Sequence, residues 1–124
     1  MFTKLRVYED AYELGLTVHR LTLELPEFEK FELGRQIRRA AVSIPLNIAE
    51  GYGRKRTQTQ FAQFVSYALG SCNELSVLLS YCHDLGYLSD VVFREIQSSC
   101  SSVGKQLTRL LQTLDKKAYP KSNV

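Results

Sequence analysis

Apolar residues recur three and four positions apart in four separate stretches of the chain. This spacing puts them on one face of a helix, as in helices that pack in a bundle. The first stretch ends at Leu25-Pro26, because proline disfavours helix at the residue before it. The core positions are Val7, Ala11, Leu14, Val18 and Leu21; Leu33, Ile37, Ala41, Ile44 and Ile48; Phe61, Val65, Ala68, Cys72, Leu75, Leu79 and Cys82; and Phe93, Ile96, Cys100, Val103, Leu107, Leu110 and Leu114.

Local signals mark where these helices begin and end. Gly51 and Gly53 follow the second stretch and suit the left-handed turn past a helix end. Thr57-x-x-Gln60 is a capping-box pattern before the third stretch, which ends before Gly86. Ser89 is a good N-cap for the fourth.

The connections between the four stretches are short, so successive helices should lie side by side in opposite directions. The sequence therefore predicts an all-α fold, an antiparallel up-down-up-down four-helix bundle over residues 1–118, with a flexible polar tail over residues 119–124. Pro45 lies inside the second helix, and we expect a kink there because its ring removes one backbone donor.

Composition places the chain among ordinary single-domain proteins. It has 124 residues, a formal net charge of +3 and no uninterrupted apolar stretch of membrane-spanning length. The first residues lack the apolar segment of a signal peptide, so we expect a cytoplasmic location and no membrane contact. Cys72, Cys82 and Cys100 lie on apolar stripes without a CxxC pair, which favours buried reduced thiols over a disulfide or zinc site.

No motif of a catalytic or cofactor site is recognisable. HExxH, P-loop, GxSxG and GxGxxG patterns are absent. A di-iron bundle needs Glu-x-x-His, but the residues three before His19 and His83 are Leu16 and Ser80. We therefore expect a protein that is not an enzyme and that holds no metal or cofactor.

The third helix carries a second row of residues, one position before each core residue. The row has two interpretations of about equal weight: deep burial in the bundle, or contact with a neighbouring subunit. Glu74 is its one carboxylate, and burial would require a partner, for which we expect Arg38 or Arg39. The row comprises Phe64, Tyr67, Ser71, Glu74, Leu78, Tyr81 and Leu85.

The second helix carries a row of small or hydrogen-bonding side chains beside its apolar stripe. A ligand or catalytic face is one interpretation, but no nucleophile and base stand at working distance. A polar seam between helices or subunits is favoured. The row comprises Gln36, Ala40, Ser43, Asn47 and Glu50.

Charge separates toward the two ends of the predicted bundle. Acidic residues collect at one end, and basic residues at the other can neutralise backbone phosphates without reading sequence. The alternative is that the cations serve only solubility. No aromatic residue is interleaved with the basic loop, so base stacking is not expected there. The acidic residues are Glu24, Glu27, Glu29, Glu32, Asp84 and Asp90, and the basic residues are Lys4, Arg6, Arg54, Lys55, Arg56, Lys116, Lys117 and Lys121.

The stretch from Gln36 to Gly51, QIRRAAVSIPLNIAEG, resembles the signature of the four-helix-bundle family of 23S rRNA intervening-sequence proteins. The likeness continues through Phe61 and Phe64, Gly70-Ser71-x-x-Glu74-Leu75 and Leu85-Gly86-Tyr87-Leu88. It implies a protomer of a homopentameric ring, related to accessory variability proteins of diversity-generating retroelements, which bind nucleic acid and a reverse transcriptase. The motif positions, interpreted first as packing and assembly determinants, are Arg38, Arg39, Ser43, Asn47, Glu50 and Glu74.

Two functions follow as hypotheses. The first is a non-enzymatic, ring-forming homo-oligomer that binds RNA or DNA through its basic end, with Arg54, Lys55 and Arg56 as the main contacts and Lys116, Lys117 and Lys121 assisting. The second is a protein–protein interaction or assembly module with no nucleic-acid binding.

Overall fold

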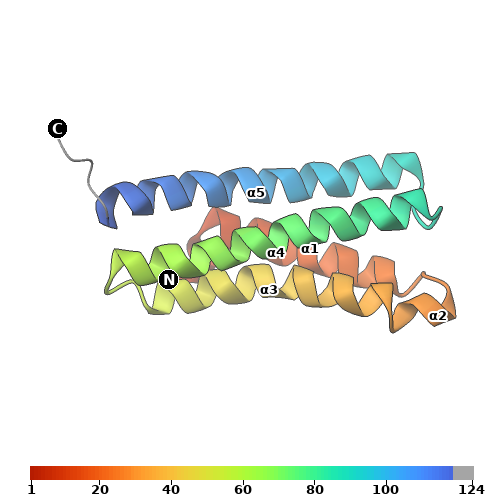
Figure 1. The fold of residues 1–124 in the computed structure, drawn as a ribbon, viewed down its shortest axis with the longest axis horizontal. Coiled ribbons are helices and arrows are strands. Elements are labelled where there is room, and N and C mark those ends of the chain that lie inside the picture. Colours follow the sequence, from red (N-terminus) through yellow and green to blue (C-terminus); the bar gives the residue numbers. More distant parts are fainter. Residues whose placement is uncertain (119–124) are drawn as a thin grey trace.

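A computed structural model describes the backbone of residues 1–118 and the side chains of residues 1–115. Four long helices lie side by side (Figure 1), and residues 1–118 contain no strand, so the all-α prediction is confirmed. The tail predicted over residues 119–124 lies outside the described residues. The elements are η1 (Phe2–Lys4), α1 (Arg6–Thr22), α2 (Glu27–Lys30), α3 (Leu33–Gly53), α4 (Gln58–Asp84) and α5 (Asp90–Ala118).

The four long helices share one core. Helix α3 packs against α1 and α4, and α5 packs against the same two helices. The predicted stripes supply the core, and burying each large aliphatic side chain stabilises the fold by about 1.5–3 kcal/mol. The largest wholly buried side chains include Ile37, Ile44 and Ile48 of α3, Leu75 and Leu79 of α4, and Leu107 of α5.

The ends of the bundle gather segments that are distant in the sequence. Figure 1 shows the N-terminal segment, the α3–α4 loop and the end of α5 at one end, with α2 and the α4–α5 loop at the other. At this second end Tyr87 Oη donates to Glu29 Oε2 at 2.9 Å. Helix α2 was not predicted, because four residues are too few to show a helical period.

The predicted helix starts are confirmed. Thr57 Oγ1 accepts from the Gln60 backbone N–H at 3.2 Å, and Ser89 Oγ accepts from that of Val92 at 3.2 Å. Helix α4 ends before Gly86, whose φ is +83°. The Tyr87 N–H then reaches back to the Cys82 carbonyl at 2.8 Å, which satisfies a carbonyl at the helix end.

The prediction that α3 closes in a left-handed turn at Gly51 and Gly53 is wrong. The helix continues through both residues, and neither has a positive φ. Gly51 is buried against α4, where an added Cβ would lie 2.8 Å from Phe64 Cβ. Its small size serves close packing. Helix α3 also runs through Pro45, and the kink expected there stays a prediction.

The three cysteines are free and buried, as predicted. Cys72 Sγ and Cys100 Sγ lie 3.7 Å apart between α4 and α5. Burial, with a smaller contribution from Glu29, raises the pKa of the Cys82 thiol to about 11. Among the described helices, none is long and apolar enough to cross a membrane.

Candidate functional site

The loop between α3 and α4 carries the basic residues on which the sequence argument depends. Arg54, Lys55 and Arg56 are all exposed. Arg54 Nε donates to Glu50 Oε1 at 2.8 Å, and its guanidinium carbon lies 5.4 Å from the centre of the Phe64 ring. The side chains of Lys116, Lys117 and Lys121 lie outside the described residues.

Aromatic rings of neighbouring elements pack against the side chains of this loop, and the expectation that bases do not stack there stays a prediction. Lys55 Nζ is 4.0 Å from the centre of the Tyr52 ring, and Tyr52 in turn packs edge-on against Phe61 and Phe2. The Lys55 ammonium, mainly by hydrogen bonding, lowers the pKa of Tyr52. These contacts do not follow from the sequence of the loop, because Phe2, Phe61 and Phe64 belong to other elements.

The polar row of α3 faces α4. Ser43 Oγ lies 2.7 Å from Ser71 Oγ, and Asn47 Nδ2 donates to the Ser43 carbonyl at 2.8 Å and to Ser43 Oγ at 3.0 Å. The middle of the row is therefore a seam between two helices of one protomer. Beside it, a hollow of about 290 Å³ is lined by Gln36, Arg39, Ala40, Ser43, Ser71 and Glu74.

The partner expected for Glu74 is wrong. Glu74 is exposed, and among the described side chains no ion pair reaches it. A carboxylate that stays in water needs no partner. Arg38 instead donates from Nη1 to Thr22 Oγ1 and from Nη2 to the Lys30 carbonyl, both at 2.8 Å, and so ties α3 to α1 and α2.

The outer surfaces of α3 and α4 expose large apolar side chains. In the second row of α4 only Leu78 is buried, whereas Tyr67, Tyr81 and Leu85 are each half or more exposed. Deep burial within the protomer therefore does not account for this row. We use the name α3–α4 outer face for a set of exposed apolar residues on these two helices: Val42, Leu46, Tyr67, Val77, Tyr81 and Leu85.

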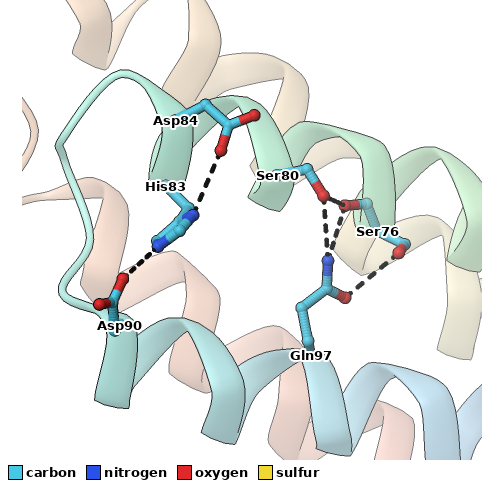
Figure 2. Close-up of polar contacts among 6 residues, drawn as sticks. All are labelled: Ser76, Ser80, His83, Asp84, Asp90 and Gln97. Atoms are coloured by element: carbon cyan, nitrogen blue, oxygen red, sulfur yellow. Dashed lines mark hydrogen bonds and ion pairs between the residues drawn. The ribbon is translucent and has the colours of Figure 1, made fainter.

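Polar side chains join α4 to α5 on another side of the bundle (Figure 2). Gln97 Nε2 donates to the Ser76 carbonyl at 3.0 Å and to Ser80 Oγ at 3.3 Å. Nearer the loop, His83 Nε2 lies 2.6 Å from Asp90 Oδ1. None of these residues was singled out as a site, since isolated serines and one glutamine in a helix carry no recognisable pattern.

Together these features define an all-helical bundle with a cationic end and an apolar outer face. The family model for 23S rRNA-intervening sequence protein matches residues 3–109. The chain belongs to this family.

One solved structure supports the same fold. A protein of unknown function from the S23 ribosomal protein family of Bacteroides thetaiotaomicron has a TM-score of 0.78 and 22% sequence identity, and the match covers 86% of this chain and 95% of that chain. At this identity the likeness speaks for the fold alone. A comparison with curated proteins found no match. The relation to retroelement accessory proteins stays a prediction.

Proposed function

We propose that this protein is a non-enzymatic, ring-forming homo-oligomer that binds RNA or DNA through the basic end of its bundle. In this proposal the helices run antiparallel, up-down-up-down. One observation carries the binding hypothesis: η1 and the start of α1, which hold the exposed cations Lys4 and Arg6, lie at the same end of the bundle as the α3–α4 loop (Figure 1).

The charge balance of this end supports phosphate contact. Glu50 offsets part of the Arg54 charge, but Arg54 is about half exposed, and an exposed pair contributes only about 0–1 kcal/mol. Among residues 1–115, no carboxylate forms an ion pair with Lys55 or Arg56. Binding of this kind releases counterions, so affinity falls as salt rises and depends little on base sequence.

The test reverses the loop charges with Arg54→Glu, Lys55→Glu and Arg56→Glu. Binding of labelled RNA and DNA oligonucleotides is measured by fluorescence anisotropy over a salt series, and helicity by circular dichroism. We expect the triple variant to lose salt-dependent binding while it keeps its helical signal. Unchanged binding would remove the proposal.

A matched control separates local charge from net charge. Arg20→Glu, Arg35→Glu and Arg94→Glu change three exposed cations nearer the opposite end by the same total charge. The control should bind nucleic acid much better than the loop variant. If both lose binding equally, the effect reflects overall charge and not the basic end.

The second candidate is an assembly module without nucleic-acid binding, and the α3–α4 outer face favours it. Light scattering gives the mass of the assembly in solution, for which the family resemblance implies a pentamer. A strict monomer would contradict the ring in both candidates. An oligomer with no affinity for RNA or DNA would favour the second, and its protein partner, such as a reverse transcriptase, would then be sought by co-purification.

A further inference from the structure

A groove runs between α4 and α5 because the residues at their contact are small. Cys72 and Ser76 of α4 face Cys100, Ser101 and Gly104 of α5, where larger side chains would fill the space. The groove has a volume of about 450 Å³. The small residues recur at helical spacing on both helices, and the groove lies where the two sets meet.

Hydrogen bonds across the seam hold the two walls of this groove together. Gln97 of α5 bonds to Ser76 of α4 through both its amide nitrogen and its amide oxygen, at 3.0 and 3.2 Å (Figure 2). Further along, Thr108 Oγ1 donates to the Gly104 carbonyl at 2.9 Å, and the same hydroxyl oxygen can accept a hydrogen bond. The walls thus carry polar groups on a fixed frame.

Two cations stand at the rim of the groove. Lys105 and Arg109 are exposed and lie one helical turn apart on α5, about 6 Å along the axis. Within residues 1–115 no carboxylate forms an ion pair with either of them. The described residues that line the groove include no aspartate or glutamate. Their charges are therefore available to an anionic ligand.

The cationic surface continues over α5 toward α1. Lys105 and Arg109 also line a second hollow, of about 350 Å³, together with Arg6 and three serines. Arg6 is 84% exposed in its side chain, and its contact with Asp10 is long at 3.6 Å, so Asp10 offsets little of its charge. The next hollow between α1 and α5 is lined by Asp10, Glu13 and Glu95, which bounds the cationic surface on that side.

We propose that the α4–α5 groove is a second phosphate-binding surface, which holds the backbone of a nucleic-acid strand that also contacts the basic end. This inference rests on the proposed function and extends its footprint from the loop along the side of the bundle. Lys105 and Arg109 contact successive phosphates, and the Ser101 hydroxyl donates to a phosphate oxygen. The described residues that line the groove include no aromatic side chain, so the surface recognises backbone and not bases.

The test compares Lys105→Ala/Arg109→Ala with the control Arg20→Ala/Arg35→Ala, which removes the same charge at exposed positions outside the groove. Affinity falls as salt rises, and each lost phosphate contact should reduce the magnitude of the slope of log affinity against log salt concentration by about 0.7–0.9. We therefore expect the magnitude of this slope to be roughly 1.4–1.8 smaller in the groove variant than in the wild type, and unchanged in the control. Helicity and assembly mass should not change in either.

Four outcomes decide between the two proposals. A lower slope in the groove variant, with binding lost in the loop variant, supports both surfaces. A groove variant that behaves like its control overturns the groove and leaves the basic end standing. A groove variant with a lower slope beside a loop variant with unchanged binding supports the groove and overturns the basic end. Wild-type protein that binds neither RNA nor DNA at low salt overturns both.

Discussion

At Gly51 the surface of α3 leaves no room for a side chain against α4. A Cβ there would meet Phe64 Cβ at 2.8 Å and Phe61 Cδ1 at 3.2 Å. Alanine favours helix over glycine by about 1 kcal/mol, but overpacking a core costs about 1–3 kcal/mol. We expect Gly51→Ala to lower the free energy of unfolding, measured by urea denaturation, by up to about 2 kcal/mol.

Gly70 is the matched control, because it also lies in a long helix and an added Cβ would meet nothing within 4 Å. Gly70→Ala should raise the free energy of unfolding by about 0.5–1 kcal/mol through helix propensity alone. If both substitutions stabilise the protein, the close contact at Gly51 does not constrain the fold.

Single residues also show where sequence reasoning stops. That Glu74 lies on an outer surface and needs no partner depends on how far α4 is rotated about its axis, which a stripe of apolar residues defines only coarsely. Arg38 contacts a carbonyl of α2, an element too short to show periodicity. Glycine occurs both in the turns that end helices and at close contacts between helices. The sequence alone therefore favoured a helix end at Gly51 and Gly53, and only the position of α4 distinguishes the two uses.

At the scale of elements, the long helices and their caps were predictable, because each leaves a local signal. Four apolar stripes marked α1, α3, α4 and α5, and the caps at Thr57 and Ser89 formed as expected. The α4–α5 groove was not predictable in the same way. It arises where small residues on two helices meet, and the pairing of positions across a helix contact cannot be read from either helix alone.

A charged contact joins the end of α4 to the start of α5. His83 lies 2.6 Å from Asp90 Oδ1, 3.3 Å from Asp84 Oδ1, and stacks on Phe93 with ring centres 4.2 Å apart. Hydrogen bonding to Asp90 raises the pKa of His83, and His83 in turn lowers the pKa of Asp90. The ionised pair therefore favours the folded state.

This contact should make stability depend on pH in a defined window. Because the pKa of His83 is raised on folding, its contribution is complete below the unfolded value of about 6.5 and is lost as pH rises through the folded value. The contribution of Asp90 is present above its unfolded value of about 4 and is lost as pH falls through its lowered folded value. The pair thus stabilises the fold most between about pH 4 and pH 6.5.

The measurement compares wild type with His83→Gln, which can still hydrogen bond but cannot ionise. Melting temperatures recorded at low salt should differ more at about pH 5.5 than at about pH 8.5, because the contribution of the ionised histidine is lost as pH rises. Asp84→Asn, at the longer contact, is the control and should have the smaller effect. An equal difference at both pH values would rule out the ionised pair as its source.

At the scale of the whole molecule, the basic end and the α3–α4 outer face meet where Phe64 lies between Arg54 and Tyr67. They consist of different residues, so substitutions at Leu46 and Tyr81 can perturb assembly without changing the basic loop. An arginine buried without a partner in an apolar interface costs several kcal/mol. We expect Leu46→Arg combined with Tyr81→Arg to convert the proposed oligomer to monomers, as measured by light scattering. Leu23→Arg combined with Val91→Arg, which changes equally exposed apolar residues outside this face, should leave the mass unchanged.

The same monomeric variant tests whether the ring matters for binding. A ring presents several basic ends to one nucleic-acid strand, and linked contacts raise the overall affinity well above that of one site. The monomer should therefore bind long oligonucleotides much more weakly than the oligomer, while the two bind similarly to an oligonucleotide only long enough for one basic end. Equal affinity for long strands would mean that each protomer binds alone and that assembly serves another purpose.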